Sequence, residues 1–116
     1  MFEQIRELRI NNPKKVTMGH ININSIPNKF EGIMDLVAKY IDIFLISETK
    51  IDSSFPDSQF SYEGYCQPHR KDRIAGGGVG LLMYVNENIP SRQMKAHVIP
   101  DDIEIISVEI NLKKQK

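Results

Sequence analysis

Hydrophobic and polar positions follow different periods along the chain, and together they predict an α/β fold. Residues 16–23 are rich in Val, Thr and Ile, which favours a strand. Apolar residues recur with the spacing of one helix face over 30–40, and 41–46 is nearly all apolar, as in a strand buried on both faces. A strand, an amphipathic helix and a second strand predict a parallel, right-handed βαβ unit. The helix face consists of Phe30, Ile33, Met34, Val37 and Tyr40.

The rest of the chain divides into a leader, a long polar segment and further strands. Residues 1–15 form a polar leader with a thin apolar stripe, where we expect a short helix. Residues 49–75 are rich in Ser, Asp, Pro and Gly without a strong period, which is typical of a functional loop. We expect strands at 79–85, after a glycine turn, and at 106–112, where apolar and polar residues alternate. The predicted organisation is a leader followed by a single partial domain over 16–116.

Composition limits the class of protein further. The chain has 116 residues, 41% of them hydrophobic, which suits one small globular domain. Its 15 basic and 15 acidic residues balance, so overall charge favours neither a nucleic-acid nor a membrane partner. A single cysteine excludes an internal disulfide framework and a cysteine-rich zinc site. With no apolar run of transmembrane length, we expect an intracellular protein without a membrane partner.

Polar residues follow two of the predicted strands at positions where packing alone would not choose them. Asn22 and Asn24 alternate at the end of the first strand, although asparagine is a poor strand residue. Glu48 directly follows the buried run, at the strand end where open α/β sheets place ligands and metals. Two ordinary explanations stand beside a functional one: the asparagines cap the strand end or form an Asx-turn, and Glu48 is a solvated terminal residue.

A basic cluster with glycines forms a third candidate. Arg70 to Arg73 precede Gly76-Gly77-Gly78, and basic side chains beside converging backbone N–H groups suit a phosphate contact. The segment is not a P-loop, because no Gly-Lys-Ser/Thr follows and the next predicted element is a strand. A charged hairpin loop is the alternative interpretation.

In this order, the segments resemble the start of the endonuclease/exonuclease/phosphatase superfamily. The leading motifs are His20-Ile-Asn-Ile-Asn-Ser-Ile26 and Asp42-Ile-Phe-Leu-Ile-Ser-Glu-Thr49. Arg70 to Arg73 and Gly76-Gly-Gly-Val-Gly-Leu-Leu-Met-Tyr-Val85 narrow the resemblance to the endonuclease domains of non-LTR retrotransposons. The likeness covers roughly residues 16 to 112, judged by the order of motifs.

This resemblance implies a fold, a chemistry and a set of residues. The fold is the N-terminal part of a truncated four-layer α/β sandwich with two mixed sheets. Glu48 would bind the divalent metal, Mg²⁺ or Mn²⁺, and Asn22 would help to hold the reacting phosphate. Asn24, Arg70 and Arg73 are candidate substrate contacts. The implied partner is DNA, nicked at a target site in the nucleus during retrotransposition.

The chain also departs from the family pattern. It has no Gly-Asp-Phe-Asn segment and no Ser-Asp-His segment, which supply a base and a phosphate-binding histidine in the family. Since losing such groups costs orders of magnitude in rate, we expect the chain to be inactive by itself. Two alternatives remain: a fragment of a phosphatase or phospholipase branch of the superfamily, and a non-catalytic nucleic-acid-binding remnant.

Overall fold

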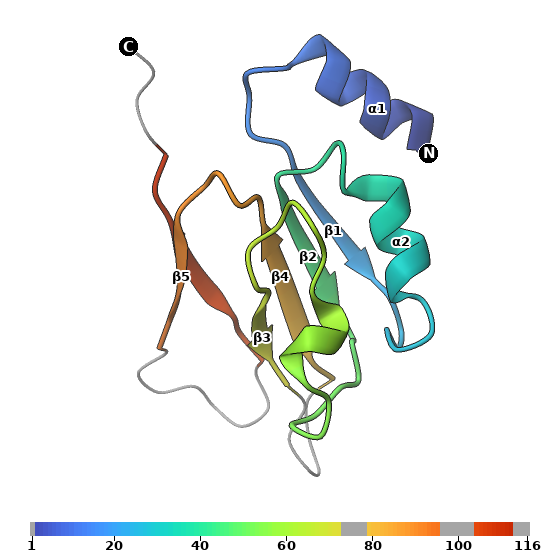
Figure 1. Cartoon of the computed structure of the whole chain (residues 1–116), viewed down its shortest axis with the longest axis vertical. Coiled ribbons are helices and arrows are strands. Elements are labelled where there is room, and N and C mark those ends of the chain that lie inside the picture. Colours follow the sequence, from blue (N-terminus) through green and yellow to red (C-terminus); the bar gives the residue numbers. More distant parts are fainter. Residues whose placement is uncertain (1, 73–78, 96–103, 113–116) are drawn as a thin grey trace.

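The computed structural model describes residues 2–72, 79–95 and 104–112, and these form an α/β structure. The described residues contain two α-helices, a mixed four-stranded sheet and a two-stranded antiparallel hairpin (Figure 1). The predicted α/β class is therefore confirmed. The elements in chain order are α1 (Phe2–Asn11), β1 (Met18–Asn22), α2 (Phe30–Val37), β2 (Ile43–Ser47), the 3-10 helix η1 (Asp57–Phe60), β3 (His69–Lys71), β4 (Leu81–Val85), β5 (Ser91–Met94) and β6 (Ser107–Ile110).

The large sheet has the strand order β1-β2-β4-β3. Strands β1 and β2 pair in parallel, with α2 between them in sequence, which confirms the predicted parallel βαβ unit. Strand β4 pairs antiparallel with β2 and with β3. The segment predicted as a loop over 49–75 thus contains a strand, β3, whose three polar residues carry no hydrophobic period. The β5–β6 hairpin forms a separate two-stranded sheet beside β3 (Figure 1).

Helix α2 packs most of its predicted apolar stripe against one face of the sheet, whereas the last predicted stripe residue, Tyr40, lies beyond the helix end at Val37. Phe30, Met34 and Val37 are buried, as the helical spacing predicts. The facing strand positions alternate, as a pleated sheet requires, so that paired residues Phe44 and Tyr84 share this face, as do Ile46 and Leu82. This face is the main hydrophobic core of the described residues.

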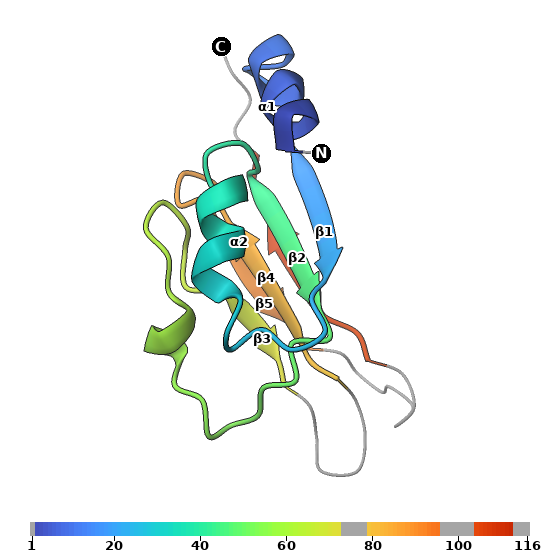
Figure 2. The ribbon, with the colours of Figure 1, turned by 90° about the vertical axis from the view of Figure 1, so that its right-hand side faces the viewer.

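The segment between β2 and β3 covers the same face, which its polar composition does not indicate. Ile51 and Phe60 are almost completely buried, and the Phe60 ring lies 5.6 Å from the Phe30 ring in an edge-to-face contact. Figure 2 shows this segment and α2 on the same side of the sheet. A few apolar anchors therefore fix a chain segment that is otherwise rich in Ser, Asp and Pro.

Helix α1 lies at the end of the sheet where β1 and β2 begin (Figure 1). Arg9 pairs with the Asp42 carboxylate and donates to the Tyr40 carbonyl at 3.2 Å. Asp42 also accepts the backbone N–H of Thr17 at 2.8 Å, so one carboxylate joins the helix to both parallel strands. The short helix predicted for the leader is confirmed. Within the described ranges, no helix has the length and apolarity needed to cross a membrane.

Two core tyrosines should make the fold sensitive to alkaline pH. The hydroxyl of Tyr65 donates to the Ile41 carbonyl at 2.5 Å, and burial raises the pKa of Tyr65 to about 12. Burial also raises the pKa of Tyr84, whose hydroxyl donates to the Phe60 carbonyl at 2.6 Å. Because the folded-state pKa values lie above the ordinary value of 10.0, this contribution to stability is complete below pH 10 and is lost as the pH rises toward 12.

The measurement is a tyrosinate absorbance titration of folded and denatured chain. We expect the denatured chain to titrate near the ordinary pKa of about 10 and the folded chain to titrate later, together with loss of far-ultraviolet circular dichroism. A folded chain whose four tyrosines all ionise near pH 10 without unfolding would contradict this assignment.

Candidate functional site at the carboxyl ends of the parallel strands

The carboxyl ends of β1 and β2 bring the sequence-predicted residues Asn22 and Glu48 to one edge of the sheet. Asn22 is the register partner of Ser47, the residue before Glu48. Parallel strands end at the same edge, and this edge lies at the opposite end of the sheet from α1 (Figure 1). Asn22 is exposed and Glu48 is half-buried, so both side chains are accessible to a ligand.

The backbone at this edge is left-handed at four positions that are not glycine. The φ angles are 48° at Asn24, 84° at Ser25, 55° at Glu48 and 59° at Lys50. Each such residue costs about 1–2 kcal/mol, and such costs cluster at binding and catalytic sites. Among the described residues no other non-glycine residue has a positive φ. Within the described ranges, the strained non-glycine backbone is therefore confined to the two loops that carry Asn24 and Glu48.

These two loops are tied to each other by backbone hydrogen bonds. The Ser25 N–H donates to the Glu48 carbonyl at 2.7 Å, and the Ile26 N–H donates to the Thr49 carbonyl at 3.1 Å. The parallel ladder thus continues past the last strand residues. Neither asparagine side chain caps the strand end or forms an Asx-turn within the described part of the chain, because the Asn24 side-chain oxygen accepts from Lys50 and Asn22 makes no side-chain hydrogen bond.

Two lysines that the sequence did not single out converge on Asn24. Lys50 Nζ donates to Asn24 Oδ1 at 2.5 Å. Lys29 Nζ donates to the carbonyls of Ile23 and Asn24 at 3.0 and 3.2 Å. The edge therefore presents two ammonium groups beside the Glu48 loop, which suits an anionic group such as a phosphate.

His20 and Ser47 lie in the adjoining part of the sheet face turned away from α2. His20 Nε2 lies 2.9 Å from Ser47 Oγ, and Ser47 Oγ donates to the Ile21 carbonyl at 3.4 Å. This chain of hydrogen bonds fixes two polar side chains next to Asn22. No sequence motif pointed to this pair, because the contact depends on the β1–β2 register.

The two residues before β4 support the Glu48 loop from the other side. The Thr49 N–H donates to the Gly80 carbonyl at 3.3 Å, and the Lys50 N–H donates to the Val79 carbonyl at 2.6 Å. The Glu104 carboxylate in turn accepts the N–H groups of Val79 and Gly80 at 3.0–3.4 Å. Thr49 is fully buried, and its hydroxyl has no hydrogen-bond partner in the described structure. Backbone hydrogen bonds therefore hold the Glu48 loop in place, and the Glu104 carboxylate supports the residues that make them.

The donor groups at this edge match the chemistry of a hydrated magnesium ion. Mg²⁺ takes oxygen ligands and commonly uses one or two carboxylates while it keeps several waters. Glu48 supplies one carboxylate, which forms no hydrogen bond or ion pair within the described ranges, and Asn22 supplies an amide oxygen. The described residues contain no cluster of three or more His, Cys, Asp or Glu that would enclose a metal. The fit is therefore to a water-exposed ion held by few protein ligands.

Of the two arginine candidates, the structure describes only Arg70. Arg70 uses all its guanidinium N–H groups on protein partners: the carboxylates of Asp72 and Asp57 and the carbonyls of Phe55 and Asp52, at 2.6–3.1 Å. The two aspartates raise the pKa of Arg70. A phosphate would have to displace these partners, so the visible role of Arg70 is to hold the segment before β3. Arg73 and Gly76-Gly77-Gly78 lie outside the described residues.

Comparison with known proteins identified no relative of this chain. No protein-family model, no curated protein and no solved structure matches the chain. The family resemblance therefore rests on the order of the sequence motifs.

Proposed function

We propose that this chain is the N-terminal part of a divalent-metal-dependent DNA endonuclease of the endonuclease/exonuclease/phosphatase superfamily, of the kind encoded by non-LTR retrotransposons. Its fold would then be the first part of the four-layer α/β sandwich of that family. The observation that carries the proposal is the sheet edge where Asn22, at the end of β1, lies beside the strained, hydrogen-bonded loops that carry Asn24 and Glu48. The sequence resemblance aligns Asn22 and Glu48 with family site positions and Asn24 with a nearby polar position.

In this proposal, each of these groups would have a part in phosphodiester hydrolysis. A divalent ion held by Glu48 would supply positive charge to neutralise the reacting phosphate. The Asn22 amide donates a hydrogen bond to a phosphate oxygen, and its exposure leaves room for that contact. The Lys50 ammonium, placed by Asn24 Oδ1, attracts the phosphodiester backbone to the same edge.

The proposal also limits what the chain does alone. The 116 residues include neither the Gly-Asp-Phe-Asn nor the Ser-Asp-His segment, which provide the base and the phosphate-binding histidine in the family. A purified chain should therefore leave supercoiled plasmid intact in the presence of Mg²⁺. Nicking by this chain that disappears in Glu48→Gln would show that these 116 residues are sufficient for catalysis.

Metal binding by the chain itself provides the direct test. Mn²⁺, a paramagnetic substitute for Mg²⁺, should broaden the amide resonances of Asn22, Ser47 and Glu48, and Glu48→Gln should abolish this broadening because it removes the anionic ligand. Glu87→Gln is the matched control, since Glu87 is an exposed carboxylate beyond the other end of β4. Broadening that is centred elsewhere, or that survives Glu48→Gln, would overturn the proposed metal site.

A further inference from the structure

A cavity of about 540 Å³ lies between β3 and the β5–β6 hairpin, and none of its described lining residues is one of the candidate residues Asn22, Asn24 and Glu48. Hydrogen bonds between β3 and β5 fix the two sides of the cavity relative to each other. His69 Nε2 lies 2.9 Å from Ser91 Oγ, and the Gln93 side chain both accepts the Arg70 N–H at 3.1 Å and donates to the Arg70 carbonyl at 3.0 Å. Gln93 thus occupies the open edge of β3 in the way a neighbouring strand would. The position of the cavity is therefore defined by these contacts between β3 and β5.

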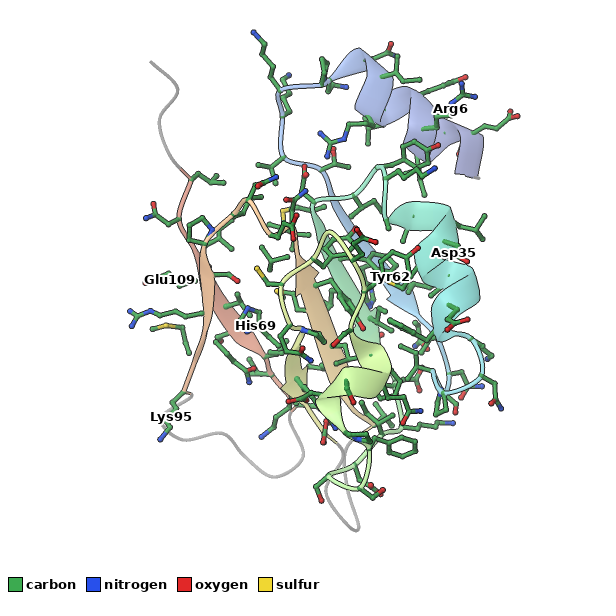
Figure 3. All side chains as sticks on the ribbon, viewed as in Figure 1. Arg6, Asp35, Tyr62, His69, Lys95 and Glu109 are labelled. Atoms are coloured by element: carbon green, nitrogen blue, oxygen red, sulfur yellow. The ribbon has the colours of Figure 1, made fainter. Side chains whose placement is uncertain are left out.

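The charged groups that line the cavity are cations. Lys71 is the last residue of β3. Lys95, which Figure 3 labels, follows the last residue of β5. Neither forms an ion pair in the described part of the chain, and no described lining residue is acidic. Among the described residues, the carboxylates close to the lining in sequence have other partners. Asp72 pairs with Arg70, Glu109 pairs with Arg92, and Glu104 accepts backbone N–H groups.

Three apolar residues, Met94, Ile105 and Ile106, also line the cavity. Met94 is 41% exposed and Ile105 is 46% exposed, although both are large hydrophobic residues. A ligand that covers them removes apolar surface from water, which favours binding. Ser107 adds a hydroxyl group that has no hydrogen-bond partner in the described structure. The cavity therefore joins a cationic part to an apolar part within one volume of the size that small-molecule sites have.

We propose that this cavity binds a terminal phosphate monoester carried by a nucleoside-sized body. A phosphate monoester has a charge of about −1.5 to −2 at neutral pH, which two ammonium groups balance. The phosphate lies between Lys71 and Lys95, and the base covers Met94 and Ile105. A free mononucleotide and the phosphorylated end of a DNA strand carry the same chemistry. The inference uses none of the candidate residues Asn22, Asn24 and Glu48, and it does not depend on the proposed nuclease activity.

The experiment is a calorimetric titration of the chain with deoxyadenosine monophosphate in the presence of EDTA. Lys71→Gln and Lys95→Gln should each weaken binding about tenfold, because each removes a charge-assisted hydrogen bond. Lys39→Gln, at an exposed position just after α2, is the matched control and should leave the affinity unchanged. Met94→Gln should weaken binding of the nucleotide but leave binding of inorganic phosphate unchanged. Deoxyadenosine without its phosphate should not bind.

Two further arms complete the test. Amide shifts in the unsubstituted chain should centre on residues 93–95 and 105–107, which keeps the test valid if a variant fails to fold. Oligonucleotides with and without a terminal phosphate distinguish the two sources of the phosphate. Preference for the phosphorylated strand supports a strand end, and binding of the mononucleotide without such a preference supports a free nucleotide.

The inference is overturned by affinities that Lys71→Gln and Lys95→Gln leave unchanged, by an equal loss in Lys39→Gln, or by the absence of binding. Since EDTA removes divalent metal, these results are independent of Glu48.

Discussion

Replacing Gly80 by alanine is expected to lower the free energy of unfolding by about 3 kcal/mol. Gly80 has a φ of 93°, a left-handed conformation that an alanine adopts only with strain. A Cβ atom at Gly80 would also overlap the hydroxyl of the buried Thr49. The two effects act at the junction of β4 with the loop that carries Glu48. A urea titration followed by circular dichroism measures the change.

Gly32 provides the control for this substitution. It lies within α2 and has no heavy atom within 4 Å of the position that a Cβ would occupy. Gly32→Ala should therefore raise stability by about 0.5–1 kcal/mol through helix propensity. Adding Thr49→Ala to Gly80→Ala removes the overlapping hydroxyl and should restore the steric part of the loss, while the backbone strain remains. A Gly80→Ala chain as stable as the unsubstituted chain would refute the assigned conformation.

Replacing Tyr84 by alanine is expected to cost about 3–5 kcal/mol, a large part of the stability of a domain of this size. The side chain is fully buried between α2 and the segment that contains η1. Its ring stacks on Phe30 at 6.0 Å and meets Tyr65 at 5.6 Å. Its hydroxyl donates to the Phe60 carbonyl at 2.6 Å. The substitution removes the centre of the aromatic core and leaves that carbonyl without its donor.

Two companion variants separate these contributions. Tyr84→Phe keeps the ring and loses only the hydrogen bond, so it should cost about 1–2 kcal/mol. Leu36→Ala, at a 44% exposed position of the same helix that covers Tyr84, should cost less than about 1 kcal/mol. Equal losses in Tyr84→Ala and Leu36→Ala would contradict the placement of the core on the α2 face.

The sequence predicts those parts of the fold that have a strong hydrophobic period. The stripe of α2 and the apolar run of β2 fix the parallel βαβ unit, and that unit brings Asn22 and Glu48 to one edge. Strand β5 has mainly polar residues, and β3 has only three residues, so neither carries such a period. Both depend on pairing with distant strands. A pattern over a few neighbouring residues does not contain this information.

The same distinction applies to the candidate site. The positions of Asn22 and Glu48 follow from strand ends, whereas those of Lys29 and Lys50 follow from left-handed turns at Asn24 and Glu48. Residues with a positive φ are uncommon outside glycine, and local sequence does not predict them. Arg70 is a similar case, because its partners are distributed over the segment from Asp52 to Asp72. In the sequence, the basic character of Arg70 and the glycines that follow favour a phosphate contact.

The strand order also determines when each part of the sheet can form during synthesis on the ribosome. Strands β1 and β2 can pair as soon as both have left the exit tunnel, with α2 between them. Strand β3 is made before β4, yet its only strand partner in the described sheet is β4. The nascent chain must therefore hold β3 outside the sheet until residues 81–85 emerge and insert beside β2. In that interval Arg70 and its aspartates can keep the segment before β3 compact, since all of these partners precede β4 in the chain.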